Sequence, residues 1–296
     1  MHALARMLLA PPRMSDGKAL YVLRRMSPGD LGLPFEPASF DLPATDHSAA
    51  IRIAAWWIEA PAASNKTVII IHGYADAKVG ALAWTPTWRE LGYNALLIDL
   101  RAHGESGGTI CTGGVLERDD LDAVLNQILV QRPDQMRELV LFGISLGGAV
   151  ALAVAARRSD VDAVIADSVF ADYASAATSH GKLIGAPLPG MLPLSIRWAE
   201  HLAGVRFADA APVDSIKKCA CPVMLIHGDA DPFVPEDQAL ELGEALIKRG
   251  NAMDDHWIVE GAGHVLSIAA DAGAYRTRLN AFLDRAIVIG TPQLHS

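Results

Sequence analysis

Short, mostly apolar runs recur along the chain and are separated by segments in which apolar residues follow helical spacing. Five runs have strand length and are bounded by turn-forming or polar residues; they cover residues 68–71, 94–100, 139–142, 161–166 and 222–226. Runs of this kind are typical of strands buried on both faces of a parallel sheet. Helical spacing is clearest in residues 121–129, 236–249 and 268–289. The alternation predicts the α/β class, with a mostly parallel central sheet and helices on both faces.

The two ends of this pattern differ from its centre. Residues 51–60 alternate apolar and polar positions before a pair of tryptophans, which predicts an antiparallel strand at the sheet edge. Residues 1–44 contain six prolines among mixed residues, and we expect an irregular N-terminal arm there without chemistry of its own. We expect a single α/β domain over residues 45–290, with a lid insertion at about 170–221, where the alternation lapses.

One strand-to-helix junction combines an apolar run, a serine and two glycines. In LVLFGISLGGAVALAVAA, from Leu139 to Ala156, Ser145 lies where the strand stops and the helix starts, with Gly143 and Gly147 two positions away. So tight a turn brings two backbone segments together, which favours residues without a Cβ and holds the serine in a strained conformation. The first helical N–H, that of Leu146, is free to donate to a developing negative charge. The glycine patterns of phosphate-binding loops, G-x-G-x-x-G and G-x-x-x-x-G-K-[ST], are both absent from this segment.

This G-x-S-x-G segment resembles the nucleophile elbow of the α/β-hydrolase superfamily, whose esterases, thioesterases and serine aminopeptidases share the motif. Three further motifs resemble the family in the same order along the chain. They are the H-G-x of residues 72–74, the H-G-x-x-D-x-x-V-P of residues 227–235 and the G-x-G-H of residues 261–264. The resemblance implies that the backbone N–H of Tyr74 forms an oxyanion hole with that of Leu146. It also implies a catalytic set of Ser145, Asp231 as the acid and His264 as the base.

A serine hydroxyl is a weak nucleophile at neutral pH, so it needs a histidine to accept its proton and a carboxylate to orient that histidine. Asp229 competes with Asp231 for the role of the acid, and the motif position favours Asp231. We expect His72 to shape the loop after residues 68–71 by hydrogen bonds, and not to act as the base. Asp99, His103 and Ser106 could be mistaken for a second catalytic set, but we expect them to order a turn by local hydrogen bonds.

The composition narrows the class of partner. The chain has 296 residues, a net charge of −9 and a pI near 5.5, and without clustered Lys and Arg we expect no nucleic-acid partner. Cys111, Cys219 and Cys221 are too few and wrongly spaced for a disulfide framework or a zinc site. No run is long enough for an integral membrane segment, and ARMLLAPP is too short for a signal sequence. We expect a cytoplasmic protein of undefined oligomeric state.

The resemblance implies a serine hydrolase that cleaves small carboxylic esters or thioesters and needs neither a cofactor nor a metal. A serine aminopeptidase-like peptidase and a non-catalytic ligand-binding relative are the alternatives. In the lid insertion, Leu183, Met191 and Trp198 are apolar candidates for the substrate pocket, although they could equally pack a helix onto the sheet. A lid of about fifty residues with several prolines predicts short to medium acyl groups.

Overall fold

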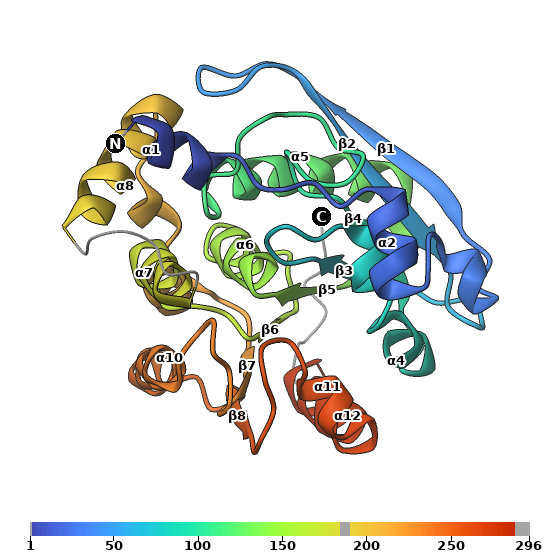
Figure 1. The fold of residues 1–296 in the computed structure, drawn as a ribbon. Coiled ribbons are helices and arrows are strands. Elements are labelled where there is room, and N and C mark those ends of the chain that lie inside the picture. Colours follow the sequence, from blue (N-terminus) through green and yellow to red (C-terminus); the bar gives the residue numbers. More distant parts are fainter. Residues whose placement is uncertain (1, 184–189, 288–296) are drawn as a thin grey trace.

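A computed structural model describes residues 2–183 and 190–287, and its centre is an eight-stranded sheet (Figure 1). The strand order is β1-β2-β4-β3-β5-β6-β7-β8; β1 and β2 run antiparallel to their neighbours and the other pairs are parallel. The strands are β1 (Glu36–Leu42), β2 (Ile51–Ile58), β3 (Lys66–Ile71), β4 (Asn94–Ile98), β5 (Glu138–Ile144), β6 (Ala163–Asp167), β7 (Val223–Gly228) and β8 (Asp255–Val259). The predicted α/β fold with a mostly parallel sheet is confirmed.

Helices cover both faces of the sheet because alternate residues of each strand point to opposite sides. Ile69 and Ile71 of β3 join the core beneath α5 (Val115–Gln131), α6 (Leu146–Ala155) and α10 (Glu236–Arg249). Val68 and Ile70 face the core beneath α3 (Lys78–Ala81), α4 (Thr85–Glu90) and α12 (Ala272–Ile287). Figure 1 shows α5, α6 and α10 on one side of the sheet and α4 and α12 on the other. Strands β3 to β8 run in the same direction, so their carboxyl ends lie along one side of the sheet. This side, called the carboxyl edge below, carries the loops of the candidate site.

The N-terminal residues are more ordered than we expected. The supposed irregular arm contains α1 (His2–Leu9), α2 (Asp16–Leu23), the short 3-10 helix η1 (Pro28–Leu31) and strand β1. Because β1 pairs with β2, the sheet edge predicted at residues 51–60 belongs to β1 instead. Pro37 is tolerated in β1 since an edge strand needs only one set of ladder hydrogen bonds.

The strands and helices that the sequence pattern predicts after residue 60 are present in the structure, with one change at the C-terminal end. The expected closing helix is divided at Asp271 into α11 (Ser267–Ala270) and α12. Residues 170–221, the expected lid insertion, contain α7 (Tyr173–Leu183), α8 (Met191–Ala203), α9 (Pro212–Ser215) and the 3-10 helices η3 (Phe207–Ala210) and η4 (Ile216–Lys218). Another 3-10 turn, η2 (Pro133–Gln135), precedes β5. Within residues 2–183 and 190–287, no helix combines the length and the apolar character needed to cross a bilayer.

Candidate active site

Ser145 occupies the sharp turn between β5 and α6, and its backbone is strained. Its φ is 53° and its ψ is −115°, a conformation that side-chain-bearing residues rarely adopt. A Cβ on Gly147 would overlap the carbonyl oxygen of Ile71 at the end of β3, and a Cβ on Gly143 would overlap the Gly147 carbonyl group. The two glycines thus allow the helix to begin directly against the neighbouring strand, and Ser145 is held at the tip of the turn.

Three side chains from distant parts of the sequence form a continuous hydrogen-bonded row. His264 Nε2 lies 3.1 Å from Ser145 Oγ, and His264 Nδ1 lies 2.6 Å from Asp231 Oδ2. The Asp231 side chain is fully buried, whereas a fifth of the His264 side chain is exposed. The ring of Phe233 packs against His264 with a centroid separation of 5.3 Å. The histidine is therefore fixed on one side by a carboxylate and is open to the serine on the other.

The two aspartates after β7 have different partners. The second oxygen of Asp231, Oδ1, accepts hydrogen bonds from the backbone N–H groups of Phe233 and Val234 at 2.8 and 2.9 Å. Asp229 is exposed, and its Oδ1 accepts a hydrogen bond of 2.6 Å from the Gly261 N–H. The structure thus brings Asp231 to the imidazole and uses Asp229 to tie together the loops after β7 and β8.

The loop after β3 passes directly beside the serine. A Cβ built on Gly73 would lie 3.4 Å from Ser145 Cβ, so the backbone between Gly73 and Tyr74 borders the hydroxyl. Leu146 is the first residue of α6, and its N–H has no acceptor within the helix. The backbone groups predicted for an oxyanion hole are therefore on the two segments that flank Ser145. The Tyr74 side chain is 40% exposed, and the burial of its remainder raises the pKa of the phenol to about 12.

His72 supports this loop. Its Nε2 accepts a hydrogen bond of 3.0 Å from the Leu100 N–H, and its Nδ1 lies 2.7 Å from the Gly73 carbonyl oxygen, to which it donates. Burial lowers the pKa of the ring to about 4. Both ring nitrogens are engaged and the ring is neutral, which matches the structural role that we expected.

The polar residues after β4 also form local contacts. Ser106 Oγ donates to the Asp99 carbonyl oxygen at 2.7 Å, and His103 Nδ1 donates to the Arg101 carbonyl oxygen at 2.8 Å. The Asp99 carboxylate accepts hydrogen bonds from the backbone and side chain of Lys78 at 2.7 and 2.6 Å. These contacts order the turn and connect it to α3, beyond the Tyr74 loop.

A buried network behind the site, centred on Asp167 at the end of β6, was not predicted from the sequence. Asp167 accepts hydrogen bonds from Tyr275 at 2.8 Å, from Ser168 at 3.0 Å and, more weakly, from Ser267 at 3.4 Å. Its carbonyl oxygen accepts from the Ser145 N–H at 2.8 Å. Burial raises the pKa of this carboxyl to about 6. The one signal in the sequence was its position, since Asp167 directly follows a predicted strand and so lies at the carboxyl edge of the sheet.

Ser168 links that network to the histidine loop. It has a positive φ of 57°, and its Oγ accepts a hydrogen bond of 3.0 Å from the Val265 N–H. Val265 directly follows His264 and also has a positive φ, of 55°. Because Asp167 accepts from the Ser145 N–H and Ser168 accepts from the Val265 N–H, these two neighbouring residues connect the loops of the serine and the histidine.

Of the three residues predicted to line the substrate pocket, the structure describes the side chains of two. Leu183 ends α7, and its side chain lies outside the part of the chain that the structure describes. Met191 begins α8 and is half-buried. Trp198 is 43% exposed, and its Nε1 donates to His2 Nδ1 of α1 at 2.9 Å. Acyl contact by Met191 or Trp198 stays a prediction.

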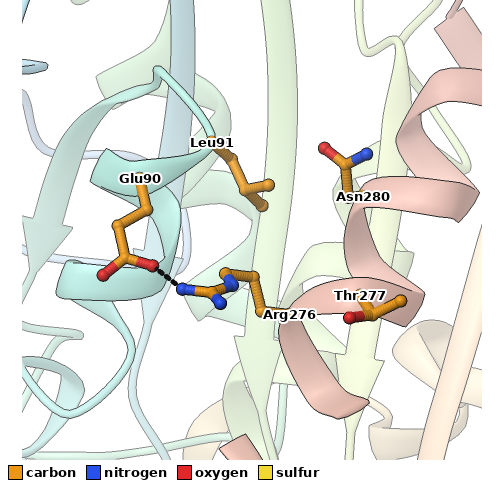
Figure 2. A pocket seen from close by; sticks show the side chains of 5 residues that line it. All are labelled: Glu90, Leu91, Arg276, Thr277 and Asn280. Atoms are coloured by element: carbon orange, nitrogen blue, oxygen red, sulfur yellow. Dashed lines mark hydrogen bonds and ion pairs between the residues drawn. The ribbon is translucent and has the colours of Figure 1, made fainter. Parts of the chain in front are cut away.

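A surface hollow of about 370 Å³ lies elsewhere, between α4 and α12, and is lined by Glu90, Leu91, Arg276, Thr277 and Asn280 (Figure 2). An ion pair between Glu90 and Arg276 crosses it. None of the residues around Ser145 borders this hollow, and it has few apolar walls, so it is not the substrate site.

Comparison with known proteins places this geometry in a family. The family model described as serine aminopeptidase, S33 matches residues 62–193, which include β3, the elbow and α7. The uncharacterized protein YqkD of Bacillus subtilis (strain 168) is 32% identical over 232 residues, or 76% of this chain and 73% of that protein.

Two other similar proteins carry a described activity. The lysophosphatidylserine lipase ABHD12 of Macaca fascicularis is 27% identical over 203 residues, or 64% of this chain and 47% of that protein, so the match spans about half of the lipase. The structure of the esterase PF2001 of Pyrococcus furiosus superimposes with a TM-score of 0.74, covering 94% of this chain and 98% of the esterase at 24% identity. That likeness establishes a shared fold.

Proposed function

The chain belongs to the serine aminopeptidase S33 family of the α/β-hydrolase superfamily, and we propose that it is a serine hydrolase acting on carboxylic esters or thioesters of short to medium acyl groups. The observation that carries the proposal is the row from Asp231 through His264 to Ser145, with donor–acceptor distances of 2.6 and 3.1 Å. Such a row contains the nucleophile, the base and the orienting carboxylate that acyl transfer requires.

In the proposed reaction, Ser145 Oγ attacks the acyl carbon and its proton moves to His264 Nε2. Asp231 accepts the Nδ1–H hydrogen bond, which holds the ring in the tautomer that leaves Nε2 free and stabilises the imidazolium once it forms. The carbonyl oxygen becomes an oxyanion, which the N–H groups of Tyr74 and Leu146 stabilise. The bond from carbon to the leaving oxygen or sulfur then breaks, and His264 protonates the departing alcohol or thiol.

Deacylation repeats these steps with water. His264 accepts a proton from the water as it attacks the acyl-enzyme, the bond between the acyl carbon and Ser145 Oγ breaks, and the proton returns to Oγ. The products are a carboxylic acid and the free enzyme. Each step uses side chains that lie within hydrogen-bond reach of the next, as general acid–base catalysis requires.

Ester cleavage is favoured over peptide cleavage because the lipase, at 27% identity, and the esterase, at a TM-score of 0.74, are more similar to this chain than the acylaminoacyl peptidase of Pyrococcus horikoshii, at 16% identity and a TM-score of 0.59. The family description supports an aminopeptidase-like enzyme as the second candidate. A ligand-binding relative without catalysis is the weakest alternative, since all three reacting side chains are present and in contact.

We propose a preference for short to medium acyl chains because the described residues between β6 and β7 form short helices, the longest of them with 13 residues. So small a cover encloses a limited apolar volume. Each methylene that fits adds about 0.8 kcal/mol of binding, and each one beyond the wall adds nothing or clashes. A p-nitrophenyl ester series from acetate to palmitate should show kcat/KM rising and then falling. A value that still climbs at palmitate contradicts the limit.

The test of the enzyme class is active-site labelling together with a burst assay. The protein should react with a fluorophosphonate at Ser145 and release a burst of p-nitrophenol from a short ester, and the Ser145→Ala variant should do neither. Parallel assays with aminoacyl anilides and acyl-CoA thioesters separate the peptidase and thioesterase activities from the esterase. A protein that is neither labelled nor active on any of these substrates is not a serine hydrolase.

A further inference from the structure

The exposed apolar side chains of this protein gather around the edge that carries Ser145. Fourteen large apolar residues are exposed in the part of the chain that the structure describes. All except Val130, Leu240 and Ile247 lie on the N-terminal arm, on α8 or on the loops after β3, β7 and β8; these are Met7, Leu20, Tyr21, Val22, Met26, Tyr74, Leu194, Trp198, Leu202, Phe233 and Leu266. Scattered single residues would need no explanation, but a collection of this size on one edge indicates an interaction surface.

Helix α2 shows the feature most sharply. Its Ala19 is buried and Leu23 packs beside it, against the core under α3. The three residues between them, Leu20, Tyr21 and Val22, are 52%, 83% and 57% exposed. The outward half of this helix is therefore apolar, the reverse of the usual arrangement in which a surface helix turns polar residues to water.

Helix α8 has a similar outward face. Leu194, Trp198 and Leu202 follow at intervals of four residues, which places them in one stripe along the helix, and each is more than 40% exposed. Arg197 and His201 are exposed beside them. Helix α1 packs along α8, with Ala5 and Leu9 buried against Ala199 and Ala203. Figure 1 shows α1 and α8 together, α2 on the other side of the same edge, and the arm running between them.

Charge distinguishes this surface from the rest of the molecule. Residues 1–25 contain Arg6, Arg13, Lys18, Arg24 and Arg25 and a single acid, Asp16, although the whole chain has a net charge of −9. Arg6, Lys18 and Arg24 are exposed. Basic and apolar side chains together on a short helical surface are the combination that anionic lipid headgroups and the adjoining acyl region attract.

The arm is fastened to the site so that this surface has a defined position. Arg13 donates from Nη1 to the carbonyl oxygens of Gly104 and Ser106 at 2.9 and 2.7 Å, and from Nη2 to that of Gly108 at 2.7 Å. The Leu9 carbonyl oxygen accepts a hydrogen bond of 2.7 Å from the Cys111 N–H. All these partners belong to the segment after β4, at the carboxyl edge of the sheet. Helices α1 and α2 are therefore held on either side of that segment.

We propose that the exposed faces of α1, α2 and α8 form a docking surface for anionic membranes and present the opening of the site to the bilayer. A protein partner would explain the apolar residues, but the excess of cations on an otherwise acidic chain favours a lipid surface. The membrane binding is independent of the chemistry at Ser145. The consequence for substrate, that esters dissolved in the bilayer are preferred to equivalent soluble esters, rests on the proposed function.

The test measures binding apart from catalysis by using the full chain with Ser145→Ala. Sedimentation with phosphatidylcholine vesicles, with and without phosphatidylglycerol, should show binding at least about tenfold tighter to the anionic vesicles and its release by high salt. Adding Leu20→Gln, Tyr21→Gln and Val22→Gln, or Arg24→Glu and Arg25→Glu, should weaken it by about tenfold or more. Two matched controls carry the same kinds of substitution on other surfaces. Val130→Gln with Ile247→Gln is the apolar control and Arg137→Glu with Arg157→Glu is the basic control, and both should leave vesicle binding unchanged.

Three results overturn the proposal: no binding to anionic vesicles, equal binding to neutral ones, or equal loss in the control variants. A dimer that the α2 substitutions convert to a monomer, without vesicle binding, assigns the surface to a contact between copies of the chain instead. In the protein with Ser145 intact, the α2 variant should keep its rate on soluble p-nitrophenyl acetate and lose rate on an ester carried in anionic vesicles. Vesicle binding without activity on any ester leaves the docking surface standing and contradicts only the proposed function.

Discussion

His264 Nε2 lies 3.1 Å from Ser145 Oγ although 119 residues separate the two positions in the sequence. The contact forms because β5 and β8 end at the same edge of the sheet, so the loops after them converge. Replacing Ser145 by alanine removes the nucleophile but little packing, since the side chain protrudes from the turn. We expect kcat to fall by on the order of a million-fold with the unfolding transition nearly unchanged. Urea unfolding and ester hydrolysis measured on the same preparation test this, and wild-type turnover contradicts the assignment.

The two aspartates after β7 give a matched pair of variants. Asp231→Asn should lower kcat by about 10⁴, because an amide in place of the carboxylate favours the wrong tautomer of His264. Asp229→Asn should have a far smaller effect on kcat, since its carboxylate is exposed and bonds to the Gly261 N–H. Steady-state kinetics of both variants, with circular dichroism to verify folding, decide between them. The reverse order would make Asp229 the acid.

Asp167 should make stability depend on pH in the direction opposite to that of a salt-bridged aspartate. Its pKa is about 6 in the folded protein against 3.8 in the unfolded chain, so the folded state binds more protons between these values. Stability from this group is full below its unfolded pKa and is lost as the pH rises through 6. Asn cannot ionise, so Asp167→Asn should gain about 1 kcal/mol relative to wild type between pH 5 and pH 8.

Urea unfolding at those two pH values measures the difference, with the exposed Asp134→Asn as a control whose effect should not change with pH. A pH-independent difference for Asp167→Asn would mean that the carboxyl is already ionised at pH 5. Because the hydrogen bond from Tyr275 lowers the pKa of Asp167, Tyr275→Phe should move the pH dependence to higher pH, not remove it.

The turn before α6 should tolerate no added atom. Gly147→Ala places a Cβ on the Ile71 carbonyl oxygen, and we expect the free energy of unfolding to fall by roughly 3 kcal/mol or more. Gly17 in α2 has open space around it, so Gly17→Ala should raise the free energy of unfolding by up to about 1 kcal/mol through its better helix propensity. Denaturant melts of the two variants compare them directly, and equal stabilities would show that the turn can relax.

The sequence was most informative where local pattern and tertiary structure agree. The strand before Ser145 is buried and uncharged from Leu139 onward, and the serine, aspartate and histidine each follow a strand end, so motif and periodicity located them together. β1 was not predicted because Pro37, Ser39 and Asp41 interrupt its apolar residues, and it forms a strand only through its pairing with β2. Asp167 escaped because its partner Tyr275 is 108 residues away, a relation that no local pattern contains. Helices α1 and α2 depend on packing against α8 and α3, which is likewise invisible in a window of eight residues.

The place of β8 at the end of the sheet has a consequence for biosynthesis. Among the described strands, β8 pairs with β7 alone, so the loop that carries His264 takes its position after the other described strands have been made. At usual rates of translation the 119 residues from Leu146 to His264 take about 6 to 24 s to appear. During that interval the nascent chain has Ser145 without His264 beside it, so on the proposed mechanism it becomes reactive only when β8 has joined the sheet.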